Sequence, residues 1–104
     1  MLKSEKSNNA LLKMIKNAEN KLEDVKTQKA FVELKRSEVR PDCEFGKEFA
    51  KIEENNLTEK ISDMQLLLDN INNTINTKKR KVKSEIFLRF NSLISQFQNI
   101  KTNI

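Results

Sequence analysis

The 104-residue chain has very few of the residues that make tight turns or reactive sites. It contains no histidine, tryptophan or tyrosine, and it has one cysteine, one glycine and one proline. Sandwiches, barrels and doubly wound sheets need many tight connections, so the shortage of glycine and proline excludes them. The missing histidine removes the commonest metal ligand, and one cysteine excludes an internal disulfide. No apolar run approaches the roughly 20 residues that span a bilayer, so we expect a mainly helical chain that works by binding.

The residues that are present follow helical periodicity in two long segments. In the first, positions spaced alternately four and three apart are apolar with two basic interruptions; they are Leu11, Ile15, Ala18, Leu22, Val25, Lys29, Val32, Arg36 and Val39. In the second, a similar spacing is formed by Ala50, Leu57, Ile61, Met64, Leu68, Ile71 and Ile75. This alternation is typical of the seam of a coiled coil.

A turn between the two segments is predicted at residues 40–46. Pro41 disfavours helical geometry at Arg40, and Gly46 completes the only concentrated turn signal in the sequence. Two helices of about 30 residues joined by so short a connection form an antiparallel hairpin. In the register that a tight turn around Cys43 permits, the facing pairs are Leu11–Ile75, Ile15–Ile71, Ala18–Leu68, Leu22–Met64, Val25–Ile61, Lys29–Leu57 and Arg36–Ala50.

The apolar pattern continues past the point where the first helix can cover it. Burying one such side chain is worth roughly 1.5–3 kcal/mol, so we expect a partner interface at Val82, Ile86, Phe87, Phe90, Leu93, Phe97 and Ile100. The prediction is an all-α protein in which residues 1–79 form the hairpin and residues 80–104 form an overhanging helical extension. Alternatively, the extension folds back with Ser84 as its N-cap and completes a three-helix bundle.

Charge is distributed unevenly along the chain. Residues 1–40 hold ten basic and six acidic residues, residues 52–77 hold five acids and one lysine, and residues 78–104 hold seven basic residues and one acid. The hairpin sets the first two segments side by side, with Lys29 and Arg36 near the acids at 53–54. Exposed ion pairs of this kind favour one orientation more than they stabilise it.

The basic excess is concentrated in one run, which comprises Lys78, Lys79, Arg80, Lys81 and Lys83. Its Lys-Lys-Arg-Lys-Val core resembles a monopartite nuclear-import signal of the large-T-antigen type. That resemblance implies a nuclear location if the source is eukaryotic; otherwise we expect the cytoplasm. The same run could instead contact phosphates, since residues 78–89 would neutralise a nucleic-acid backbone without reading its sequence. A solvated helix face is the third interpretation.

No catalytic, cofactor-binding or metal-binding residue is predicted. Cys43 lies between two acids, which disfavour its thiolate, and no histidine could activate it. Glu59 and Asp63 share a helix face, but a solvated or partner-pairing role suits them better than metal binding or acid–base chemistry.

We therefore expect a non-enzymatic coiled-coil subunit or adaptor of a larger, nuclear helical assembly. It would bind other helical protein subunits, as a hetero- or homo-oligomer, through its C-terminal amphipathic helix. The alternative is a basic nucleic-acid-associated factor that contacts phosphates non-specifically. A membrane surface is not an expected partner, because the polar face after Lys83 has only Arg89 and Lys101 as basic residues.

Overall fold

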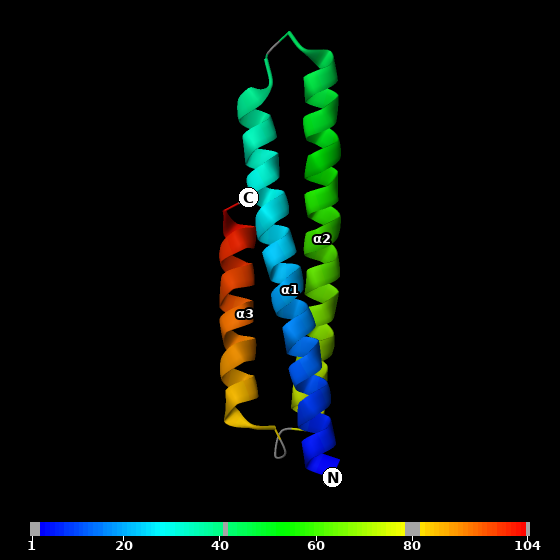
Figure 1. Cartoon of the computed structure of the whole chain (residues 1–104), viewed down its shortest axis with the longest axis vertical. Helices are drawn as coiled ribbons and strands as arrows, with labels where there is room; N and C mark the ends of the chain where they lie inside the picture. Colours follow the sequence, from blue (N-terminus) through cyan, green and yellow to red (C-terminus); the bar gives the residue numbers. More distant parts are fainter. Residues whose placement is uncertain (1–2, 41, 79–81, 104) are drawn as a thin grey trace.

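A computed structural model shows an elongated, all-helical molecule with extents of 63 × 19 × 17 Å. It describes residues 3–40, 42–78 and 82–103. These residues form three helices and no strand: α1 (Lys3–Glu38), α2 (Glu44–Thr77) and α3 (Ser84–Thr102). Figure 1 shows α1 and α2 as a long antiparallel hairpin, which confirms the predicted fold class and its main element.

The connection between α1 and α2 is closed by local hydrogen bonds. The Cys43 N–H donates to the Arg40 carbonyl at 3.0 Å, and the Lys47 N–H donates to the Cys43 carbonyl at 3.1 Å. Cys43 is the N-cap of α2, and its Sγ accepts a hydrogen bond from the Gly46 N–H at 3.2 Å. A Cβ at Gly46 would lie 3.2 Å from that sulfur, so a larger residue at this position would crowd the capping side chain. The turn lies where it was predicted, but α2 already begins at Glu44.

The seam of the hairpin is buried almost as the sequence indicates. Its fully covered side chains on α1 and α2 are Leu11, Ile15, Ala18, Leu22, Val25, Val32, Leu57, Met64, Leu68, Ile71 and Ile75. Ile61 packs against this core with part of its surface exposed. Because these side chains repeat along both helices, one continuous apolar interface holds the hairpin together.

Polar contacts across the hairpin agree with the predicted register. Lys60 Nζ lies 3.1 Å from Asp24 Oδ2, and Gln28 Nε2 donates to Glu53 Oε2 at 2.8 Å. Arg36 Nε donates to Glu54 Oε1 at 2.7 Å, the pairing that the charge pattern favours. Lys29 departs from the prediction, because its Nζ pairs with Glu33 of its own helix at 3.9 Å. Arg36 therefore pairs with an acidic residue of the facing helix as predicted, whereas Lys29 does not.

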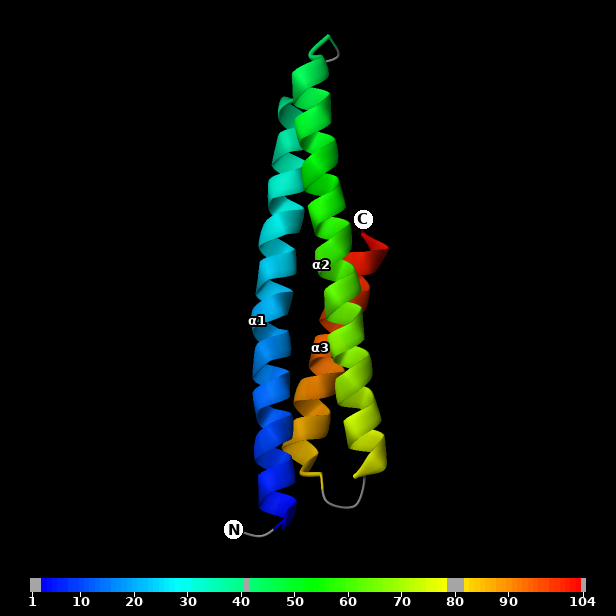
Figure 2. The same ribbon diagram turned by 90° about the vertical axis from the view of Figure 1, so that its right-hand side faces the viewer.

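The C-terminal segment does not overhang the hairpin, and this part of the prediction is wrong. α2 ends at Thr77, and α3 returns beside α1, as both views show (Figures 1 and 2). The alternative, a three-helix bundle, is therefore correct for the half of the molecule that α3 covers. α3 joins the common core with five buried side chains: Ile86, Phe90, Leu93, Phe97 and Ile100.

Local chemistry explains why the chain breaks between α2 and α3. The last turns of α2 are rich in asparagine and threonine, which are poor helix formers. At the start of α3, the Lys83 N–H donates to Oδ1 of Asn8, a buried residue of α1, at 3.1 Å. The N-cap is thus Lys83, without a side-chain cap of its own, and Ser84 is the first helical residue rather than the predicted cap. An acceptor 75 positions away in the sequence holds the start of α3.

Three further contacts fix α3 along the hairpin. Arg89 pairs with Glu19 of α1. Lys26 Nζ of α1 donates to Gln96 Oε1 at 3.0 Å, and Lys101 Nζ donates to Gln65 Oε1 of α2 at 3.0 Å. α3 stops well short of the loop between α1 and α2 (Figure 1). The molecule therefore has a three-helix base, defined here as residues 3–30, 55–78 and 82–103, and a two-helix tip, residues 31–40 and 42–54.

Candidate interaction surfaces

The residues predicted to form a partner interface lie inside the three-helix base. Ile86, Leu93 and Phe97 are 0%, 2% and 1% exposed, and Phe90 and Ile100 are each 7% exposed. Val82 and Phe87 are partly buried against the same core. The prediction rested on the lack of any cover within the chain, and α1 and α2 supply that cover. In this conformation these side chains are not available to a partner.

The two-helix tip is where the chain exposes large apolar side chains together. Phe45 is 82% exposed, Ile52 54%, Leu34 52% and Phe49 39%. We call these four residues and Phe31 the tip patch. Within the tip only Val32 and Ala50 are buried apolar residues. α3 ends before the tip and covers none of these side chains (Figure 1). The tip patch is thus an apolar surface that no other part of the described chain covers.

Two rings and one lysine give the tip patch a fixed shape. Phe31 of α1 meets Phe49 of α2 edge to face, with centroids 6.5 Å apart and planes at 68°. Lys35 Nζ lies 5.2 Å from the Phe31 centroid and 5.5 Å from the Phe49 centroid, within cation–π range. The ammonium thus covers the junction of the two helices and pairs with Glu38 at 3.4 Å.

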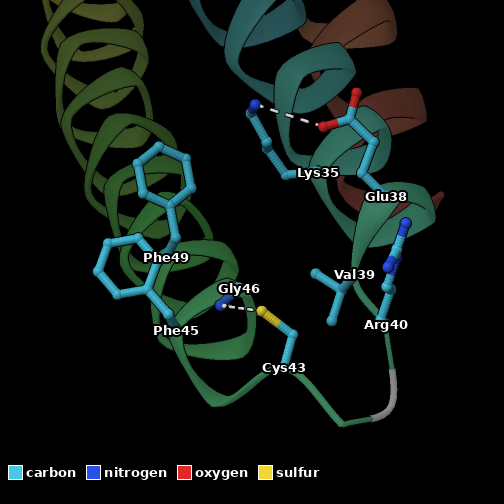
Figure 3. Close-up of a pocket in the computed structure, with 8 residues that line it drawn as sticks. All are labelled: Lys35, Glu38, Val39, Arg40, Cys43, Phe45, Gly46 and Phe49. Carbon is cyan, nitrogen blue, oxygen red and sulfur yellow. Dashed lines mark hydrogen bonds and ion pairs between the residues drawn. The ribbon is translucent and has the colours of Figure 1, made fainter.

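A pocket of about 510 Å³ opens beside the tip patch. Figure 3 shows its walls converging from the end of α1, the loop and the first turns of α2. Its lining residues are Lys35, Glu38, Val39, Arg40, Cys43, Phe45, Gly46 and Phe49. The Cys43 sulfur accepts the hydrogen bond from the Gly46 N–H, and Phe45 and Phe49 form one wall of the pocket. Such a pocket suits an apolar side chain from another molecule.

The first half of α2, which carries Phe45, Phe49 and Ile52, is rich in acidic residues. Residues 42–59 hold six acidic residues and two lysines. Asp42, Glu44 and Glu48, which are close to Phe45 and Phe49 in the sequence, are exposed. The start of α2 is therefore acidic, whereas the charged residues that line the pocket itself are Lys35, Arg40 and Glu38.

The basic run that resembles an import signal lies at the opposite end of the molecule. Lys78 is the C-cap of α2, and Lys83 is the exposed N-cap of α3. The other members of the run, residues 79–81, lie outside the described residues. Its roles in import or phosphate contact therefore stay predictions.

The described residues contain no group of three or more histidine, cysteine, aspartate or glutamate side chains that could hold a metal ion. Glu59 and Asp63 are both exposed on α2. No helix within the described part of the chain is long and apolar enough to cross a membrane.

Sequence reasoning missed the tip patch, although a signal for it exists. Phe45, Phe49 and Ile52 are spaced four and three residues apart, the same spacing as the buried seam. They form a second apolar stripe on α2, next to the first. An apolar stripe beyond the one that a hairpin needs indicates a further contact surface.

Comparison with protein families, with curated proteins and with solved structures gives no match for this chain. Its function is therefore inferred from its own geometry.

Proposed function

We propose that the chain is a non-enzymatic coiled-coil subunit or adaptor of a larger helical protein assembly, and that it docks through the tip patch. The observation that carries this proposal is the contrast in exposure between Phe45, at 82%, and the interior side chains of α3, at 7% or less. A binding protein presents apolar area where its own fold does not cover it.

The partner that fits the tip is an amphipathic helix with basic residues beside its apolar face. Its apolar side chains would lie on Phe45 and Ile52 and enter the pocket next to Phe49. Its lysines or arginines would face Glu44 and Glu48. Helices that lie in grooves bind in this way, with apolar anchors setting the affinity and charges setting the choice of partner.

Docking through α3, as expected from the sequence, would need α3 to leave the base. Each of its five buried side chains contributes about 1.5–3 kcal/mol by its burial, and a partner would have to replace all of them. The tip needs no such rearrangement. In this proposal α3 supports the base and leaves partner binding to the tip.

A nuclear location remains part of the proposal for a eukaryotic source. It is supported by the sequence of the basic run between α2 and α3 alone. A fusion of the full chain to a fluorescent protein tests it, with Lys78 and Lys83 replaced by glutamine in the matched variant. Loss of nuclear enrichment is the expected result, and unchanged enrichment would contradict the import role.

The docking proposal is tested by the size of the complex that the tagged full chain forms in its own cells. The tip variant is Phe45→Ser with Ile52→Ser. The control is Leu66→Ser with Leu88→Ser, because these residues are exposed to a similar extent in the base, 64% and 71%. We expect the wild type and the control to elute in gel filtration well above the 12.2 kDa of the chain.

The tip variant should elute at the size of the free chain with its helical circular dichroism unchanged. If the tip variant stays in the large complex, or if the base control leaves it, the tip is not the docking surface. A wild-type chain that elutes alone would contradict the role as a subunit.

A further inference from the structure

The return of α3 gathers basic residues from three separate parts of the sequence at one end of the molecule. The start of α1, the end of α2 and the start of α3 all lie at the end opposite the loop (Figures 1 and 2). The hydrogen bond from the Lys83 N–H to Asn8 ties two of these parts together. We define the basic pole by Lys13 and Lys16 of α1 together with Lys78 and Lys83.

The basic pole is accessible and is unlike the rest of the surface. Lys13, Lys16 and Lys83 are exposed, and Lys78 is half-buried. Six basic and three acidic residues lie in the described segments that meet at this end, 8–21, 65–78 and 82–89. The rest of the hairpin has the opposite balance, with eight basic and eleven acidic residues in the described segments 22–40 and 42–64. The long axis of the molecule is therefore also an axis of charge.

We infer that the basic pole binds the phosphate backbone of duplex nucleic acid. Lysines at several positions around one end of the molecule can meet several phosphates at once, because a duplex presents closely spaced negative charges. Backbone contacts by lysine position a protein without reading the sequence. This inference is independent of docking at the tip.

Two observations favour a duplex over the other polyanions. An amphipathic helix that inserts into an anionic membrane needs an exposed apolar face beside its basic residues, and α3 turns its apolar face into the core and leaves Leu88 as its exposed large apolar side chain. Binding to single strands needs exposed aromatic rings on which bases stack. Phe90 and Phe97 are buried and Phe87 is partly buried, so the described residues of the pole offer no such platform.

The test measures binding of the full chain to a fluorescein-labelled 20-base-pair DNA duplex by anisotropy, from 50 to 200 mM KCl. With four lysines on phosphates, affinity should fall about a hundredfold over this range. Two double variants probe the pole from its two sides: Lys13→Gln with Lys16→Gln, and Lys78→Gln with Lys83→Gln. Each should weaken binding about tenfold at low salt and flatten the salt dependence.

The matched control is Lys47→Gln with Lys51→Gln, which removes the same charge from the acidic half of the molecule. It should bind the duplex nearly as the wild type does. Equal losses in the control and the pole variants would show that only net charge matters and would overturn the inference. So would a Lys13/Lys16 variant that binds like the wild type, because the surface would then not include α1. Tighter binding to phosphatidylserine vesicles than to the duplex would assign the pole to a membrane instead.

Discussion

The base and the tip are built from the same two helices, yet they differ in what covers them. In the base, α3 lies against the hairpin and the apolar side chains between the helices are sealed. In the tip, the seam is held by Val32 and Ala50, while Phe45, Phe49 and Ile52 stay exposed. A third helix that is shorter than the hairpin thus divides one rod into a closed half and an open half. The open half is where an interaction can form without unfolding anything.

The largest difference between the two regions should come from truncating one phenylalanine in each. Phe97→Ala in the base should cost about 3–5 kcal/mol of unfolding free energy, because it leaves a cavity beneath a side chain that is 1% exposed. Phe45→Ala in the tip should change stability by less than about 0.5 kcal/mol. Urea denaturation followed by circular dichroism measures both. If Phe97→Ala does not fold, Phe97→Leu serves in its place with a smaller loss, and equal effects at the two sites would contradict the division.

The next largest effect concerns the contact that holds the start of α3. Asn8→Ala removes the acceptor of the Lys83 N–H inside the base and should cost about 1–2 kcal/mol. Asn8→Asp keeps an oxygen at that position, beside the positive end of α3, which offsets part of the cost of burying a carboxylate, and it should lose less than Asn8→Ala. Thermal unfolding of both variants gives the comparison. Identical losses would show that the side-chain oxygen has no part in placing α3.

A smaller effect is expected for the ion pair of the tip. Arg36→Ala removes the 2.7 Å contact between Arg36 and Glu54. The two side chains are 48% and 39% exposed, respectively. An exposed pair contributes about 0–1 kcal/mol and is screened by salt. The wild type and the variant should therefore converge in stability as NaCl is raised toward 1 M. A difference that persists at high salt would indicate that Arg36 acts by packing.

The smallest effect is expected at the cap of α2. Cys43→Ser keeps a side-chain acceptor for the Gly46 N–H, and serine is a preferred N-cap, so stability should stay within about 0.5 kcal/mol of the wild type. Cys43→Ala removes the acceptor and should be less stable than Cys43→Ser by about 0.5–1 kcal/mol. Chemical denaturation measures the unfolding free energies of the two variants. Equal stability of Cys43→Ser and Cys43→Ala would show that the sulfur does not cap the helix.

The hairpin could be predicted from the sequence because its determinants are local or periodic. Pro41 and the spacing of the seam indicate where the chain turns, and the turn limits the register. The charge pattern also identified the contact between Arg36 and Glu54. These features depend on which residues lie a few positions apart, and a single sequence displays that directly.

The course of α3 could not be predicted in the same way. The apolar spacing continues through Lys78 and Val82 to Ile86, so one long helix and two shorter ones share the same pattern. What distinguishes them is the acceptor on Asn8, far away in the sequence, together with cover from two other helices. The exposed patch was missed for a related reason, since the spacing of Phe45 and Phe49 does not show whether another helix covers them.

Hydrogen exchange of the intact chain, followed by mass spectrometry, tests the division into a closed base and an open tip most directly. Amides of α3 between Ile86 and Ile100 should exchange as slowly as those of α1 and α2 in the base, because their opening requires the shared core to open. Amides of α2 between Glu44 and Ile52 should exchange faster. Fast exchange throughout α3, with the slowest amides in the tip, would contradict the closed base and would favour the prediction that the C-terminal helix projects from the hairpin.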